Sequence, residues 1–280
     1  MIKNAAIDIG SNTLKIAYLK NNKLKNYEKV LNLALFVQNN CLNADGIKVL
    51  INEFTYLSTI FDLKNAFALS TAVFRRINNA KEILELLYKK FNLKVQILTQ
   101  EEEAALTRLA NKNLGYDDFY LVDIGGNSCE ITSNDEKIYF DFGLLSIYEE
   151  YKKSKANLRD FVQEFLNKKI NNFKLKEGLK IVLTSKSAIF AKSLKENKYY
   201  KDVDDTLYHK QLINKDEIIN LSNFLETSNE EQIEFIIGKN RKFAVLIACY
   251  LLNFLFKEDT FIISSFSIKE ALLIKHNILK

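Results

Sequence analysis

Two short glycine loops, each entered from an apolar run that ends in an aspartate, constrain the fold of this chain more than any other feature. The first reads Asp8-Ile9-Gly10-Ser11-Asn12 and the second reads Asp123-Ile124-Gly125-Gly126-Asn127. Around both loops the order is the same: an apolar strand, Asp-Ile-Gly, a small residue, an asparagine and a hydroxyl residue. This weak internal repeat predicts two domains of similar core topology, joined near residues 115–118.

Length and composition agree with two folded domains. The chain has 280 residues, of which 48% are hydrophobic and 27% are charged, so each half can bury a core. Its three cysteines are an odd number without metal-ligand spacing, which argues against a disulfide framework or a zinc cluster and favours a reducing compartment. No signal-peptide pattern follows the N-terminus, and the longest apolar stretch, 243–256, is too short to span a bilayer. We therefore expect a cytoplasmic protein without a membrane partner.

Strand and helix signals alternate along the first half of the chain. Alternating or continuous apolar runs bounded by turn residues predict strands at 5–8, 14–19, 23–30, 66–69, 95–98, 181–184 and 261–264. Apolar residues at helical spacing predict helices at 45–61, 80–91, 99–114, 154–173, 187–196, 215–225 and 241–256, with a final helix from about residue 267. The β-α-β-α order favours an α/β domain with a mixed sheet, followed by a more helical second half.

Each loop has the chemistry of a phosphate site. Glycine lets backbone N–H groups approach an anion, and the side chains of Ser11 and Asn12 could add donors. Asp8 would repel phosphate unless a cation lies between them, and magnesium, often bound by carboxylates together with phosphate oxygens, resolves the conflict. The second loop repeats this arrangement with Asp123, and Glu130 follows on the returning strand. One such loop alone is more simply an ordinary hairpin turn, but two loops with the same aspartate favour function.

Three consecutive glutamates open the helix expected after Thr99. Glu102 stands where a capping box places its carboxylate, and acidic residues favour a helix N-terminus, so capping explains Glu101 and Glu102. Glu103 is not needed for the cap and could orient and deprotonate a water for attack on phosphorus. Arg75 follows the end of a predicted strand, where an arginine can grip phosphate bidentately, although a surface ion pair explains it equally simply.

Other candidate groups receive no catalytic role. His209 and His276 form no metal pattern, and Cys129 is expected to be a small packed thiol. Residues 152–201 hold fourteen Lys and Arg against four acidic residues. This excess predicts either a positive field for a polyanion or a solvated helical surface, and no recognition motif supports nucleic acid.

Together, in order, these residues resemble the exopolyphosphatase/guanosine pentaphosphate phosphatase family, within the actin/sugar-kinase/heat-shock-chaperone ATPase superfamily. The similar segments cover residues 5–150 well. They are the first phosphate motif at 6–13, the Thr-x-x-x-Arg segment at 71–75 with Asn79, the stretch with the catalytic glutamate at 98–104, the second loop at 123–130, and a weaker continuation at 142–145.

The resemblance implies a duplicated actin-like (ribonuclease H-like) α/β fold, with mixed sheets flanked by helices and an interdomain cleft. We expect domains at 1–117 and 118–280, with the last helix, about 267–280, able to pack back on the N-terminal domain. The implied general base is Glu103, and the implied magnesium ligands are Asp8, Asp123 and Glu130. The implied phosphate-binding residues are Gly10, Ser11, Asn12, Arg75, Gly125, Gly126, Asn127 and Ser128.

The implied activity is magnesium-dependent release of terminal phosphate from a polyanion, either inorganic polyphosphate or guanosine pentaphosphate. Residues 182–187 and 267–271 depart from the family by losing glycines, Asn127 replaces a glycine in the second loop, and Gln100 replaces another. These losses motivate an alternative, a phosphate or alarmone sensor with weak or no hydrolysis. A kinase or ATPase of the superfamily is a third hypothesis. It is disfavoured because the glycine-rich nucleotide contacts expected in the second domain are missing. A homodimer is possible.

Overall fold

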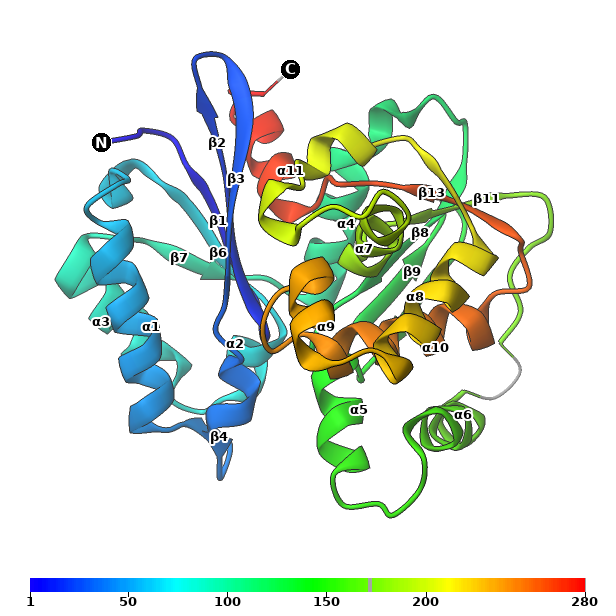
Figure 1. Ribbon diagram of the computed structural model, residues 1–280. Coiled ribbons are helices and arrows are strands. Elements are labelled where there is room, and N and C mark those ends of the chain that lie inside the picture. The colour runs from blue at the N-terminus through cyan, green and yellow to red at the C-terminus, as the bar shows by residue number, and fades with distance from the viewer. Residues whose placement is uncertain (171–172, 280) are drawn as a thin grey trace. The chain divides into compact units, whose positions relative to one another are not determined.

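The computed structural model describes residues 1–170 and 173–279, and the chain divides into two compact units. Unit 1 comprises Met1–Lys112, Gly125–Asn127 and Phe266–Lys280, and unit 2 comprises Asn113–Ile124 and Ser128–Ser265. Each unit is built on one mixed sheet flanked by helices, so the α/β class expected from the sequence is confirmed (Figure 1).

The sheet of unit 1 has the strand order β3-β2-β1-β6-β7. Its strands are β1 (Ala6–Ile9), β2 (Thr13–Lys20), β3 (Lys23–Val30), β6 (Phe67–Ser70) and β7 (Val95–Ile97), and a separate two-stranded ribbon pairs β4 (Val37–Gln38) with β5 (Cys41–Leu42). The first three strands of the sheet are antiparallel neighbours, and β6 and β7 continue it in parallel with β1.

The sheet of unit 2 repeats this arrangement in the order β10-β9-β8-β11-β13-β12. Its strands are β8 (Phe119–Ile124), β9 (Cys129–Thr132), β10 (Lys137–Phe140), β11 (Lys180–Leu183), β12 (Leu212–Asn214) and β13 (Thr260–Ile263). Three antiparallel strands again lead into two parallel ones, and β12 adds an antiparallel edge. The repeated loops in the sequence therefore correspond to a repeated strand topology.

Two cores cover the two faces of the first sheet. The helices of unit 1 are α1 (Ala44–Leu57), α2 (Ala72–Arg76), α3 (Ala80–Phe91), α4 (Gln100–Ala110) and α11 (Ile268–Lys275). On one face the core includes Leu50 and Phe54 of α1 and Leu87 of α3. On the other face α11 buries Leu272 and Leu273 against the sheet and packs beside α4. The C-terminal helix is thus part of unit 1.

A larger core fills one side of the second sheet. The helices of unit 2 are α5 (Leu144–Tyr151), α6 (Leu158–Lys169), α7 (Lys186–Lys195), α8 (Lys215–Thr227), α9 (Glu230–Ile237) and α10 (Lys242–Leu255). The apolar stretch of α10 is the buried helix that the sequence predicts, with Val245 to Leu252 all buried. No helix within residues 1–170 and 173–279 is long and apolar enough to cross a membrane.

Several boundaries differ from the sequence expectation. The helix expected at 154–173 begins only at Leu158, because the Asn157 side chain caps it by accepting a hydrogen bond from Arg159 N at 2.9 Å. It ends at Lys169, and residues 171–172 of that expectation lie outside the described residues. Residues 72–76 form the short helix α2, so Arg75 lies on a helix that follows strand β6.

Candidate phosphate and hydrolysis site

The first loop is a tight turn that requires glycine for steric reasons. Gly10 N donates to Thr13 O at 3.1 Å, which brings the end of β1 against the start of β2. A Cβ atom at Gly10 would lie 2.9 Å from Thr13 O, closer than carbon and oxygen approach in practice. Any larger residue would therefore push the two strands apart.

Polar side-chain atoms are buried at this loop without a protein partner. The segment after β3 holds the backbone of the loop, because Asn12 O accepts hydrogen bonds from Leu31 N and Asn32 N, both at 2.8 Å. Within residues 1–170 and 173–279, the buried atoms Ser11 Oγ, Asn12 Oδ1 and Ser70 Oγ have no hydrogen-bond partner. Ser11 and Asn12 follow β1, and Ser70 ends the neighbouring strand β6. Unsatisfied buried polar atoms are costly, so this group at adjacent strand ends fits a site that a polar ligand completes.

Asp8 faces a lysine that the sequence interpretation missed. In the β1–β2 ladder Asp8 lies directly opposite Lys15, and directly opposed residues of antiparallel strands project on the same face. Asp8 itself is buried. The period-two alternation of the returning strand could have identified Lys15, since it places every second residue after Thr13 on one face. The first loop therefore carries both signs of charge.

The structure brings Arg75 and Glu103 into direct contact. Arg75 Nη1 donates to Glu103 Oε2 at 2.7 Å and to Leu98 O at 2.9 Å. Their side chains are only 21% and 11% exposed, so solvent screens this ion pair weakly. The contact also fixes the carboxylate beside a cation, in the position a general base would need. In the described part of the chain, Nη2 and Nε of Arg75 make no hydrogen bond, so the guanidinium keeps donors for an anion.

At the N-terminus of α4, Glu102 and Glu103 have different roles: Glu102 is structural, and Glu103 is the candidate for chemistry. Glu102 N donates to Thr99 Oγ1 at 3.1 Å, and Thr99 N donates to Glu102 Oε2 at 2.8 Å, so the predicted capping box is confirmed. Glu101 and Glu102 are exposed, whereas Glu103 is buried beside Arg75. Capping thus accounts for Glu102 and leaves Glu103 available for chemistry.

The second loop, between β8 and β9, is fixed through its backbone. Arg76 Nη2 donates to Asn127 O at 2.8 Å, so the second of the two adjacent arginines supports the loop. Asn127 and Ser128 are buried, and Gly125 and Gly126 precede them in the loop. Asn79, the asparagine expected in the motif after Arg75, instead holds the backbone of Leu42 by two hydrogen bonds of 2.9 and 3.0 Å.

Two carboxylates oppose each other across β8 and β9. Asp123 and Glu130 are direct partners in this antiparallel ladder and therefore share a face of the sheet. Burial, with the charges of Glu130 and Asp123 adding to it, raises the pKa of the Cys129 thiol well above its ordinary value. This shift keeps Cys129 a neutral thiol, in agreement with the packed role expected from the sequence.

Asp123 and Glu130 are the kind of ligand that a divalent cation takes. Like charges placed directly opposite each other are destabilising, and magnesium is commonly held by one or two carboxylates together with substrate phosphate oxygens. Among residues 1–170 and 173–279, no group of three or more His, Cys, Asp or Glu forms a ready-made metal cluster. Asp123 and Glu130 belong to unit 2, and Asp8 belongs to unit 1.

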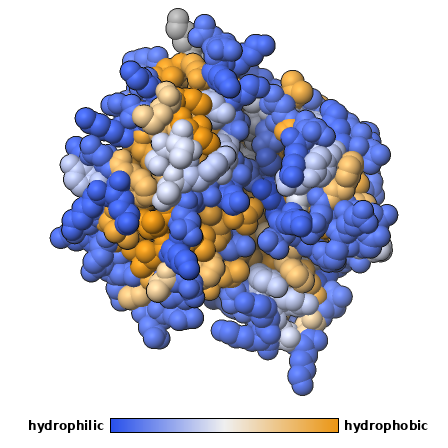
Figure 2. Space-filling model, turned by 60° about the vertical axis from the view of Figure 1, so that its left-hand side comes forward, coloured by the Kyte–Doolittle hydropathy of each residue, from blue (hydrophilic) through white to orange (hydrophobic). Residues whose placement is uncertain are grey.

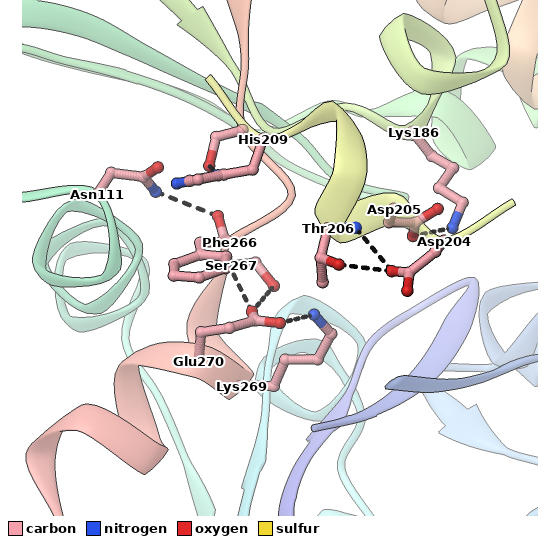
Figure 3. Close-up of polar contacts among 11 residues, drawn as sticks. Asn111, Lys186, Asp204, Asp205, Thr206, His209, Phe266, Ser267, Lys269 and Glu270 are labelled. Atoms are coloured by element: carbon pink, nitrogen blue, oxygen red, sulfur yellow. Dashed lines mark hydrogen bonds and ion pairs between the residues drawn. The ribbon is translucent and has the colours of Figure 1, made fainter. Parts of the chain in front are cut away.

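In the two segments that lost glycines, residues 182–187 and 267–271, charged side chains form ion pairs. Lys186, in the first of these segments, pairs with Asp205 of unit 2, so its charge is already matched (Figure 3). In unit 1 the carboxylate of Glu270, which is fully buried, accepts from Ser267 N at 2.8 Å and pairs with Lys269 (Figure 3).

Many of the lysines in the basic segment 152–201 are ion-paired. At least seven of its lysines contact carboxylates; they are Lys152, Lys168, Lys176, Lys186, Lys192, Lys195 and Lys198. Paired surface charges produce a weaker field than the sequence count indicates. Of the two interpretations, the solvated helical surface is the one these contacts favour.

Comparison with known proteins identifies the family of this arrangement. The model of the Ppx/GppA phosphatase family matches residues 34–277. No curated protein matches the chain.

Solved structures match over the whole length of the chain. The Ppx/GppA family member of Aquifex aeolicus is 20% identical, with a TM-score of 0.71, covering 99% of this chain and 98% of that one. An exopolyphosphatase from Cytophaga hutchinsonii is 17% identical, with a TM-score of 0.78 and the same coverage. An exopolyphosphatase-like protein is 14% identical, with a TM-score of 0.74, covering 98% and 97%. At these identities the structural likeness establishes the shared actin-like fold.

Proposed function

The chain belongs to the Ppx/GppA phosphatase family, and from this premise we propose that it hydrolyses the terminal phosphoanhydride bond of inorganic polyphosphate or guanosine pentaphosphate. The observation that carries the proposal is the ion pair of 2.7 Å between Arg75 and the buried Glu103. It joins a phosphate-binding cation to a candidate general base in one unit. The exopolyphosphatase among the matching structures supports the same reaction class.

The first loop and Arg75 would hold phosphate oxygens. Ser11 Oγ is a buried hydroxyl without a protein acceptor among the described residues, and Nη2 and Nε of Arg75 supply charged donors. Gly10 would let phosphate approach the loop closely, and the side-chain amide of Asn12 would add a donor to this half of the site. Gly125, Gly126, Asn127 and Ser128 would serve the same purpose from the second loop. Hydrogen-bond donors of this kind stabilise the charge that develops on phosphate oxygens during transfer.

Glu103 would act on the attacking water. Its carboxylate, positioned by Arg75, would accept one proton as the water oxygen forms a bond to the terminal phosphorus. The anhydride P–O bond breaks, its electron pair stays on the shortened substrate, and orthophosphate is released. The proton then passes from Glu103 to solvent or to a product oxygen. This sequence consumes one water and leaves no covalent intermediate on the protein.

Magnesium is proposed as the cofactor, with Asp123, Glu130 and Asp8 as its carboxylates. When bound, the ion would neutralise phosphate charge and thereby reduce repulsion by these side chains. Lys15, opposite Asp8, would supply further positive charge at the first loop. The direct opposition of Asp123 and Glu130 is the structural support for this assignment.

A non-hydrolysing phosphate or alarmone sensor is the second candidate. It is favoured by the closed Lys186–Asp205 contact, which stands where the sequence lost two glycines. It is opposed by the burial and pairing of Glu103, because a binding protein has no need of a buried carboxylate beside its phosphate cation.

Phosphate release from polyphosphate, guanosine pentaphosphate and ATP, with magnesium or with EDTA, separates these candidates. We expect metal-dependent release from one of the first two substrates and a loss of about 10²–10⁴-fold in Glu103→Gln. Glu101→Gln, which changes the exposed neighbour two residues earlier, is the matched control and should retain activity. Tight binding without release in the wild type would establish the sensor, and full activity in Glu103→Gln would remove the general base.

A further inference from the structure

Unit 1 contains a cavity that the proposed reaction does not use. Its volume is about 540 Å³, within the range of about 300–1,000 Å³ that small-molecule sites occupy. β6 and β7 form one wall, and α4 and the end of α11 form the others. The lining has an apolar part, made by Leu69, Leu98, Ala105, Leu106 and Leu272, and a polar part, made by Lys94, Gln96, Glu102, Lys275 and His276.

A flat aromatic platform borders this cavity. The rings of Phe67 and His276 stack with centroids 3.7 Å apart and an interplanar angle of 8°. Because His276 is exposed, stacking on Phe67 fixes a side chain that would otherwise be free in solvent. Preformed ring surfaces of this kind favour a planar aromatic ligand, which gains stacking and apolar contact there.

The charges at the cavity favour an anion. Lys94 and Lys275 both line it, and both are exposed lysines with no carboxylate ion pair in the described chain. The acidic lining residue, Glu102, already accepts a hydrogen bond of 2.8 Å from Thr99 N at the positive end of α4. Two lysines therefore face one carboxylate that the capping box has engaged. Figure 2, which brings the left-hand side of Figure 1 forward, shows apolar surface interspersed with hydrophilic side chains.

We propose that this cavity, lined by β6, β7, α4 and α11, is a second ligand site for a small planar aromatic anion of the nucleoside monophosphate class. The base would stack at the Phe67–His276 platform and contact Leu106 and Leu272, and the phosphate would lie between Lys94 and Lys275. The site is distinct from the loops that hold the scissile phosphate. Glu102 links the two sites within unit 1: it lines the cavity, its carboxylate caps α4, and the next residue is Glu103.

The experiment uses the full chain with ¹³C-labelled leucine methyl groups and adenosine 5′-monophosphate as the probe. We expect saturable shifts of the Leu106 and Leu272 methyl signals, with little change at Leu50, which lies in the core on the other face of the sheet. Leu31, whose backbone N–H holds the first loop, reports binding at the proposed phosphate site in the same spectra. Shifts at Leu31 alone would place the nucleotide at the phosphate loop and overturn the proposal.

Matched variants and partial ligands complete the test. Lys275→Glu should weaken the nucleotide by about tenfold, because it replaces an attractive charge by a repulsive one, and His276→Ala should weaken it by about threefold. Lys90→Glu makes the same charge change on an exposed position of α3 that does not line the cavity, and should bind like the wild type. Adenosine should bind about tenfold more weakly, since it lacks the phosphate. Equal affinity for adenosine, for inorganic phosphate or for the two cavity variants would refute the assignment.

Discussion

At the scale of single residues, contact partners distinguish chemical candidates from structural ones. Glu102 and Glu103 are adjacent in sequence and identical in type, but one closes a capping box and the other is buried against Arg75. Arg75 and Arg76 also differ in role, since Arg75 pairs with Glu103 and Arg76 donates to the Asn127 carbonyl of the second loop. Residue type therefore supplies the candidates, and contact partners assign their roles.

Thiol reactivity should separate the three cysteines. Burial raises the pKa of Cys129, with Glu130 and Asp123 adding to the shift, and burial also raises the pKa of Cys249. Since the thiolate is the reactive form, neither should react in the folded protein, whereas the partly exposed Cys41 should. A colorimetric disulfide reagent should therefore titrate one thiol in native protein and all three in denaturant. Rapid native labelling of Cys129, located by mass spectrometry, would contradict its buried neutral state.

The carboxyl of Glu196 should contribute stability in a defined pH range. Hydrogen bonds from Lys198 and then from the Tyr208 hydroxyl lower the pKa of Glu196 from its ordinary value of 4.5. A pKa depressed by folding stabilises the native state above the unfolded value, and this contribution is lost as the pH falls through the folded value. The melting temperature of Glu196→Gln should thus lie below that of the wild type near pH 7, and the difference should shrink below pH 4.5. The exposed pair partner Glu164, changed to Gln, should show a smaller difference throughout.

At the scale of elements, the sequence patterns predict long regular helices correctly and miss short ones. The prediction of residues 80–91 as a helix is confirmed as α3, because its apolar spacing is regular. The sequence interpretation did not predict α9, whose eight residues bury Ile233, Ile236 and Ile237. A segment so short has little intrinsic helical stability, and its packing in the unit 2 core supplies the rest.

The capping box of α4 should stabilise the helix that carries Glu103. Replacing Thr99 by Ala removes the acceptor of Glu102 N and should cost about 1 kcal/mol of helix stability. Hydrogen exchange of the amides at the start of α4 should accelerate accordingly, and Thr99→Ser should retain most of the wild-type protection. Unchanged exchange in Thr99→Ala would mean that tertiary packing alone holds the first turn.

At the scale of the whole molecule, the chain order and the compact units do not coincide. Unit 1 ends its long segment at Lys112 but includes Phe266–Lys280 from the other end of the chain. Asn111 lies where the two segments of unit 1 meet, and its Nδ2 donates to Phe266 O at 3.1 Å. The core of this region combines Ala6, Leu69 and Leu98 with the α11 residues Leu272 and Leu273.

A fragment comprising residues 1–117 should accordingly fold poorly by itself. It would expose the face of the sheet that α11 covers, and losing buried leucines of this kind costs about 2–5 kcal/mol each. A peptide of residues 266–280 added in trans should restore dispersed methyl signals and raise the melting temperature of the fragment. The same peptide with Leu273→Asp is the control. A fragment that is equally stable with either peptide, or with none, would show that α11 is dispensable for unit 1.

The sequence by itself determined the local features of this protein. The turn at Gly10 follows from steric limits, the capping box from three neighbouring residues, and the duplicated strand-loop-strand from a repeated pattern. Only the tertiary structure decided which side chains meet across long stretches of chain. Arg75 reaches Glu103 across 28 residues, and Asn111 reaches Phe266 across 155. The physical reason is that local patterns record interactions between near neighbours, whereas burial and charge pairing depend on the closure of the whole core.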